Sequence, residues 1–205
     1  MAENILVFGD SITYGAWDKE GGWVTRLRRF LQEQSLNTDE EQGRLVYNLG
    51  VSGDSTQDLL LRFESEVKTR LDEGIETIII FAIGLNDSLF IKTENKHKVS
   101  LSKFEENLLK LITLAKKYTS KIVFIRLTSV DEEKTDPIPW DPVKSYKNEY
   151  IQQYNSLLEK ICNQEKVDFI KIEKFSNDLF EDGLHPNSKG HKIIFEAVKN
   201  YLLKK

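Results

Sequence analysis

Residues 76–83 read ETIIIFAI, an almost continuous run of apolar side chains. Such a run is typical of a strand that is covered on both faces, as in a parallel sheet. Further runs of the same kind lie at residues 4–8, 45–49, 121–128 and 167–172. The sequence therefore predicts a sheet of five parallel strands.

Amphipathic patterns separate these runs. Apolar side chains recur at spacings of three and four, which is typical of helices with one buried face. The ranges with this pattern are 22–35, 55–72, 100–117, 144–164 and 188–203. Ser102, with Glu105 three residues later, resembles a capping box at the start of the third helix. Strands that alternate with single helices indicate a three-layer α/β/α fold of flavodoxin-like type, whose sites lie at the carboxyl ends of the strands.

The composition is that of an ordinary globular domain. Of the 205 residues, 40% are hydrophobic and 30% are charged, unlike the composition of disordered chains. Single cores usually stop growing only at about 250 to 300 residues. We therefore expect a single domain over residues 1–205.

Charge and hydropathy restrict the partners. The net charge is −4, and acidic and basic residues are interspersed, so no phosphate-binding stripe is present and we expect no nucleic-acid partner. No apolar stretch approaches the ~20 residues that span a bilayer, so we expect no membrane span. Residues 1–4 lack the features of a secretory signal, and the lone Cys162 fits a reducing compartment. We expect a cytoplasmic protein, and homo-oligomer formation stays open.

Ser11 follows the first predicted strand, whereas Asp182 and His185 lie near the other end of the chain. A serine hydroxyl is a weak nucleophile at neutral pH, so acyl transfer needs an imidazole base and a carboxylate that orients it. Pro186 biases His185 away from the helical conformation. These residues form a candidate Ser-His-Asp triad if the fold brings the two segments together.

Four sequence blocks resemble those of the SGNH hydrolases, the GDSL lipase/esterase family. They are GDSI at residues 9–12, NLGVSGDS at 48–55, GLND at 84–87 and DGLHP at 182–186. Each block is weak alone, but four in this order and spacing are specific. Ile12 stands where the common motif has leucine, and this apolar exchange leaves the chemistry unchanged.

The resemblance implies an SGNH fold and ester hydrolysis through an acyl-Ser11 intermediate, with Asp182 and His185 as the other triad members. It also implies an oxyanion hole formed by the Ser11 backbone amide, Gly53 and Asn86. A tetrahedral oxyanion needs several convergent donors, and an asparagine amide is a donor that stays neutral at every pH.

Several neighbours of these residues have structural interpretations. Asp10, Asp54 and Asp87 lie in turns, where aspartate most often accepts bonds from nearby backbone amides. Gly50 shares a loop with Gly53, but the SGDS setting at residues 52–55 matches the family better. His97 lies between two lysines and is expected to be exposed. The histidines and the cysteine have no metal-ligand spacing, and we expect no metal and no cofactor.

The substrate pocket is the least determined part of the prediction. Candidate lining residues are Tyr14, Trp17, Phe90, Trp140 and Leu184. The aromatic residues could equally pack in the core or in a lid. Residues 129–146 form a long irregular segment, which is either a lid or substrate wall, or a surface excursion or dimer contact.

Three functions remain at this point. The first is an esterase that cleaves a small-molecule carboxylic ester or thioester. The second is a deacetylase that uses the same residues on a small acetylated sugar or metabolite. The third is a non-catalytic flavodoxin-like module that binds a phosphate-bearing ligand, which the sequence disfavours because it contains no dinucleotide fingerprint or P-loop pattern.

Overall fold

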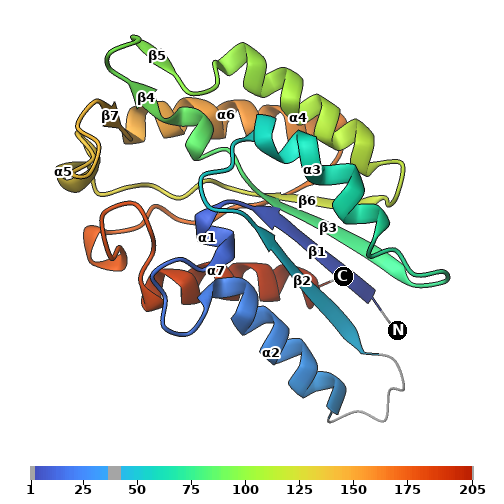
Figure 1. Ribbon diagram of the computed structural model, residues 1–205. Coiled ribbons are helices and arrows are strands. Elements are labelled where there is room, and N and C mark those ends of the chain that lie inside the picture. The colour runs from blue at the N-terminus through green and yellow to red at the C-terminus, as the bar shows by residue number, and fades with distance from the viewer. Residues whose placement is uncertain (1–2, 37–42, 205) are drawn as a thin grey trace.

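A parallel sheet forms the centre of the computed structural model, which describes residues 3–36 and 43–204. Its order is β2-β1-β3-β6-β8 (Figure 1). The strands are β1 (Glu3–Gly9), β2 (Arg44–Gly50), β3 (Glu76–Ala82), β6 (Lys121–Ile125) and β8 (Asp168–Ile170). The predicted five-stranded parallel sheet is confirmed, although β6 and β8 end earlier than expected.

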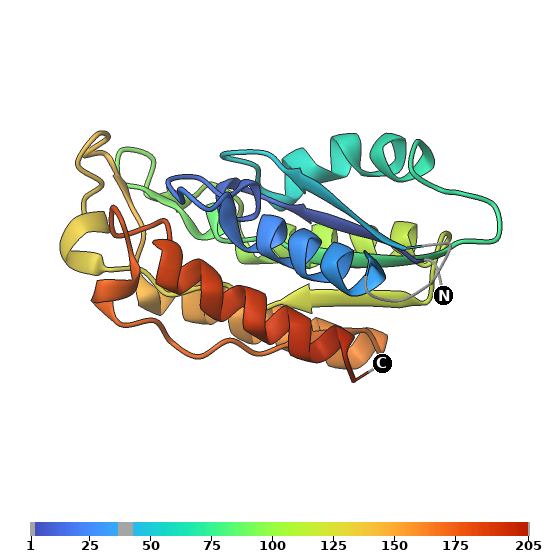
Figure 2. The ribbon, with the colours of Figure 1, turned by 90° about the horizontal axis from the view of Figure 1, so that it is seen from below.

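Helices cover both faces of this sheet (Figures 1 and 2). One face carries α3 (Thr56–Lys68), α4 (Leu101–Ala115) and α6 (Asn148–Glu165), and the other carries α2 (Gly22–Leu36) and α7 (Ser188–Leu202). Successive side chains of a strand point to opposite faces. In β1, Leu6 and Phe8 therefore enter the core under the first group of helices, while Ile5 and Val7 enter the other. This double burial explains why the strands are apolar at almost every position.

Several short elements were not predicted. They are α1 (Ser11–Tyr14), α5 (Glu132–Thr135), the 3₁₀ helices η1 (Asn86–Ser88) and η2 (Asn177–Leu179), and a small antiparallel sheet of β4 (Phe90–Ile91), β5 (Lys96–His97) and β7 (Lys144–Ser145). Because residues 144–145 pair with β4, α6 begins at Asn148, and the prediction of a helix from residue 144 was wrong.

Two local expectations also need correction. The capping residue of α4 is Ser100, whose hydroxyl accepts a bond from the Lys103 amide at 3.3 Å, because the helix begins before Ser102. His97 is half-buried, since strand alternation in β5 turns it inward while Lys96 stays exposed. Its Nδ1 lies 3.0 Å from the carbonyl of Ser88, and its ring packs edge-on against Tyr150.

No helix in the two described ranges is both long and apolar enough to cross a bilayer. Met1 and Ala2, which belong to the segment expected to lack a secretory signal, lie outside the described residues.

Candidate active site

The candidate site residues gather where the parallel strands end. β1 leads directly to Ser11 at the start of α1, β2 leads to the loop with Gly53, and β3 leads to Asn86 at the start of η1. Asp182 and His185 lie in the segment before α7. The carboxyl ends of parallel strands lie at the same edge of a sheet, so the loops after β1, β2 and β3 come together there (Figure 1). Hydrogen bonds place the segment before α7 at the same edge.

A line of hydrogen bonds joins the three predicted triad residues. His185 Nε2 lies 2.9 Å from Ser11 Oγ, and His185 Nδ1 lies 2.7 Å from Asp182 Oδ2. Asp182 Oδ1 also accepts bonds from the backbone amides of Leu184 and His185, at 3.0 and 2.7 Å. Burial raises the pKa of Asp182, but the bonds from His185 and Leu184 outweigh this effect and hold the pKa below its usual value. The carboxylate is therefore ionised at neutral pH.

Local sequence keeps His185 outside the helix that follows it. Asn187 is the N-cap of α7, and its side chain accepts bonds from the Lys189 and Gly190 amides at 3.0 and 3.3 Å. At Gly183 the backbone has a φ of +92°, and a Cβ there would lie 2.6 Å from the Cβ of Lys134. Glycine is the residue that fits this close, left-handed turn.

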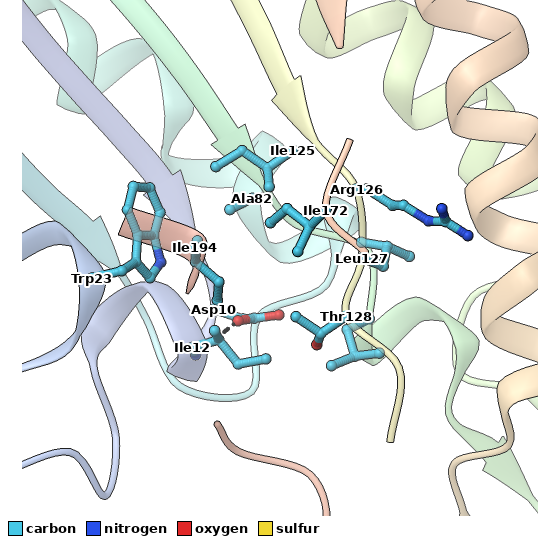
Figure 3. A pocket seen from close by; sticks show the side chains of 11 residues that line it. Asp10, Ile12, Trp23, Ala82, Ile125, Arg126, Leu127, Thr128, Ile172 and Ile194 are labelled. Atoms are coloured by element: carbon cyan, nitrogen blue, oxygen red, sulfur yellow. Dashed lines mark hydrogen bonds between the residues drawn. The ribbon is translucent and has the colours of Figure 1, made fainter. Parts of the chain in front are cut away.

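Asp10 caps the short helix that presents the serine. Its Oδ1 accepts a bond from the Ile12 amide at 3.0 Å, which agrees with its structural interpretation. Figure 3 shows that its other oxygen points towards the side chains that line a mainly apolar cavity, among them Trp23, Ile125 and Ile172. The volume of this cavity is about 30 Å³. Burial raises the pKa of Asp10 to about 6, although the Ile12 amide and the charge of His185 act in the opposite direction.

Contacts with other loops hold two of the predicted oxyanion donors, Gly53 and Asn86, in place. Gly53 has a φ of +84°, and Lys98 Nζ donates to its carbonyl at 2.7 Å. Asn86 Nδ2 donates to the carbonyl of Asp54 at 2.9 Å, and Asn86 Oδ1 accepts a bond from the Tyr146 hydroxyl at 2.6 Å. The backbone of Gly50 packs instead against α1, because a Cβ there would lie 2.3 Å from the amide nitrogen of Tyr14.

The aspartates beside these donors link their loops to α3. Asp54 pairs with Arg62 Nε at 2.8 Å. The buried Asp87 carboxylate accepts bonds from the amide, at 3.0 Å, and the hydroxyl of Thr56. Burial raises the pKa of Asp87 to about 6, against the lowering effect of the Thr56 bonds.

A cavity of about 450 Å³ opens beside Ser11. Its lining includes Ser11, Gly53, Asn86 and His185, the apolar residues Leu89, Ile138 and Leu184, the aromatic residues Trp17, Trp140 and Tyr146, and the charged residues Lys98, Asp141 and Lys144. The expected pocket residues Trp17, Trp140 and Leu184 therefore line it. The site is an open pocket whose apolar lining residues are buried, whereas the tryptophans at its rim are exposed.

Two expected pocket residues lie elsewhere. Tyr14 ends α1, is followed by the left-handed Gly15, and leaves 62% of its surface exposed outside the cavity. Phe90 packs its ring against His97 and Tyr150. Neither borders the 450 Å³ cavity, because closeness in sequence to a site loop does not set the direction of a side chain.

The segment 129–146 forms one wall of this cavity, as one of its two interpretations expected. Ile138, Trp140, Asp141, Lys144 and Tyr146 all border the cavity. Sequence reasoning missed Tyr146 and Lys98, for which no local motif exists. Their roles follow from β4 pairing with both β5 and β7, which brings Lys98 and Tyr146 next to η1.

The chain is similar to known proteins over most of its length. The profile of the GDSL-like Lipase/Acylhydrolase family matches residues 7–193. An isoamyl acetate-hydrolyzing esterase from Saccharomyces cerevisiae is 27% identical, over 96% of this chain and 84% of the relative. An acetylxylan esterase from Geobacillus stearothermophilus is 25% identical, over 95% of this chain and 91% of the relative.

Solved structures share the fold. An acetyl xylan esterase from Geobacillus stearothermophilus superposes with a TM-score of 0.73 at 23% identity, covering 97% of this chain and 93% of the other. A lipolytic G-D-S-L protein from Veillonella parvula gives a TM-score of 0.70 at 21% identity, covering 97% of both chains. The chain therefore belongs to the GDSL-like lipase/acylhydrolase family and is an ester-hydrolysing enzyme.

Proposed function

We propose that the protein hydrolyses small-molecule carboxylic esters through an acyl-Ser11 intermediate. The observation that carries this proposal is the unbroken hydrogen-bond line from Ser11 Oγ through both ring nitrogens of His185 to Asp182. His185 accepts the serine proton as Oγ attacks the ester carbonyl, and then donates that proton to the departing alcohol. Asp182 holds the ring tautomer and stabilises the imidazolium.

The second half of the cycle uses the same groups. His185 takes a proton from water, which attacks the acyl-enzyme and releases the carboxylic acid and the free serine. The oxygen of each tetrahedral intermediate accepts bonds from the Ser11 and Gly53 backbone amides and from Asn86 Nδ2. The loss of one such donor typically lowers the rate by about 100- to 1,000-fold.

Replacement of the nucleophile tests this mechanism. We expect Ser11→Ala to lower kcat by more than about 1,000-fold and to abolish labelling by a fluorophosphonate probe. Ser156→Ala, which removes an exposed hydroxyl of α6, is the control and should keep both activity and labelling. Unchanged ester turnover in Ser11→Ala would contradict the proposal.

The rim of the pocket supports one substrate class in particular, an acetylated sugar or similarly polar acetate ester. Trp17 and Trp140 are 68% and 60% exposed, and charged groups lie beside them on the cavity wall. Flat aromatic surfaces with adjacent polar groups suit an alcohol that has both apolar and hydroxylated faces. The names of two relatives, an acetylxylan esterase and an isoamyl acetate-hydrolyzing esterase, also indicate acetyl groups.

Acyl-chain length and alcohol type separate this candidate from its competitor, an esterase or thioesterase for longer acyl groups. Rates should be measured with p-nitrophenyl esters from C2 to C8 and with acetylated xylose. Highest kcat/KM for acetyl substrates, together with loss of sugar-ester activity in Trp140→Ala, would support the deacetylase. A rise in kcat/KM towards C8 would favour the competitor. The third alternative, a non-catalytic binding module, is wrong because the chain is an ester-hydrolysing enzyme.

A further inference from the structure

The side-chain amide of Asn86 is held at both of its ends. Its Nδ2 donates to the backbone carbonyl of Asp54 at 2.9 Å, and its Oδ1 lies 2.6 Å from the hydroxyl of Tyr146. A backbone carbonyl can only accept a hydrogen bond, so the amide nitrogen must face Asp54 and the amide oxygen must face Tyr146. Tyr146 is therefore the donor in the second bond.

This arrangement leaves one N–H of Asn86 available. Asn86 and Ser11 border the same cavity, and the amide group is planar. Once its oxygen and one of its hydrogens are engaged, the direction of the remaining N–H is determined. Without the Tyr146 bond only the Asp54 contact remains, and the terminal torsion of an asparagine side chain is soft.

Tyr146 is itself rigidly placed. It is only 4% exposed. Its backbone amide donates to the carbonyl of Thr135 at 3.0 Å, and the hydroxyl of the fully buried Thr135 donates to the carbonyl of Tyr146 at 3.0 Å. Burial, with the nearby charges of Asp10 and Asp87, raises the pKa of Tyr146 well above its usual value, so the hydroxyl keeps its proton.

We propose that Tyr146 is a positioning residue, which holds the Asn86 amide in the orientation that stabilises the oxyanion. The inference rests on the proposed function, in which Asn86 is an oxyanion-hole donor. In this role Tyr146 acts on the oxyanion through Asn86, to which its hydroxyl donates. Its effect should therefore be felt in the transition state and not in the binding of the ester.

The variant Tyr146→Phe removes only the hydroxyl. We expect kcat to fall by roughly 3- to 10-fold, the range for one neutral hydrogen bond, with KM unchanged. Asn86→Ala should lower kcat by about 100- to 1,000-fold. In the Asn86→Ala background, Tyr146→Phe should cause no further loss of kcat, because the group that it positions is absent.

Tyr154→Phe is the matched control. Tyr154 is also a buried tyrosine, and its hydroxyl donates to the carbonyl of Val99, away from the cavity. Its variant should lower thermal stability to a similar extent but leave kcat unchanged. Equal losses of kcat in the two tyrosine variants would mean that Tyr146 has only a structural role.

Other outcomes also decide the matter. If Tyr146→Phe lowers kcat equally in the wild-type and Asn86→Ala backgrounds, or leaves kcat unchanged while Asn86→Ala is inactive, the positioning role is wrong and the proposed function stands. If Asn86→Ala keeps full activity, the oxyanion assignment fails as well.

Should Tyr146→Phe not fold, NMR of the wild-type protein provides the test. One Asn86 side-chain N–H should exchange slowly and the other should shift when a phenylboronic acid binds, whereas fast exchange of both would overturn the proposal.

Discussion

At the scale of single residues, Asp10 is a carboxylate in an apolar environment. It is 3% exposed, and beyond the Ile12 amide it borders the cavity shown in Figure 3. Burial raises its pKa from 3.8 to about 6. The folded protein therefore holds this proton more tightly than the unfolded chain between these two values. The resulting stabilisation is fully present below pH 3.8 and is lost as the pH rises through about 6.

The variant Asp10→Asn tests the direction of this pH dependence. Asparagine keeps the oxygen that caps α1 and removes the charge. We expect the variant to be more stable than the wild type at pH 8, by about 1 to 3 kcal/mol, and of equal stability near pH 4. Urea unfolding at the two pH values measures the difference.

The control is Glu20→Gln, which neutralises an exposed carboxylate and should change stability by less than about 1 kcal/mol at either pH. A larger gain in the free energy of unfolding for Asp10→Asn at pH 4 than at pH 8 would contradict the predicted direction of the pH dependence.

At the scale of elements, α6 takes over the bonding of the chain that follows β6. Asn155 accepts a bond from the Leu127 amide at 2.9 Å and donates to the Leu127 carbonyl at 3.1 Å. Asn148, two turns earlier on α6, makes the same pair of bonds with Val130, at 3.0 and 2.9 Å. These side chains replace a neighbouring strand, which explains why β6 ends at Ile125 although the predicted strand extends to residue 128.

Asn155→Ala should therefore be strongly destabilising. Loss of this side chain leaves the amide and the carbonyl of Leu127 without partners in a buried position, at a cost of about 2 to 4 kcal/mol. The free energy of unfolding in urea measures this. Asn163→Ala, an exposed site on the same helix, should cost less than about 1 kcal/mol, and similar losses in the two variants would contradict the explanation.

The sequence patterns predicted the long elements and missed the short ones. The helices on the sheet faces repeat their apolar spacing over three or more turns, so their existence could be predicted. β4, β5 and β7 have two residues each, and two residues contain no readable period. These short strands form because their backbones pair by hydrogen bonds in the folded chain.

At the scale of the whole molecule, α2, near the start of the chain, and α7, at its end, pack side by side (Figure 2). Arg26 of α2 forms an ion pair with Asp18 and donates to the hydroxyl of Ser188, at the start of α7, at 2.7 Å. Burial raises the pKa of Asp18, but the bonds from Arg26 and from the Glu20 and Gly22 amides lower it to about 2. This contact joins the loop after the nucleophile to the helix after His185.

Removal of the Arg26 charge should destabilise the protein. The Asp18 side chain is fully buried, so Arg26→Gln leaves an uncompensated charge, at a cost of about 3 to 5 kcal/mol. Arg29→Gln, which breaks an exposed pair with Glu20 at 3.5 Å, should cost less than about 1 kcal/mol. Thermal and urea unfolding of both variants measure the contrast, and equal stability would refute the role of Arg26.

The sequence by itself determined the class of fold, and its resemblance to the SGNH hydrolases indicated which residues to expect in the triad and the oxyanion hole. Apolar periodicity and turn chemistry are local properties, and parallel strands place the loops after them at one edge without further information. Only the tertiary structure decided that Tyr146 forms a hydrogen bond with Asn86, that Tyr14 and Phe90 lie outside the pocket, and that polar side chains lie at the rim of the pocket. Those features depend on contacts between residues far apart in the chain, such as Asn86 and Tyr146, which are separated by 60 positions. Such contacts form only when the layers pack together.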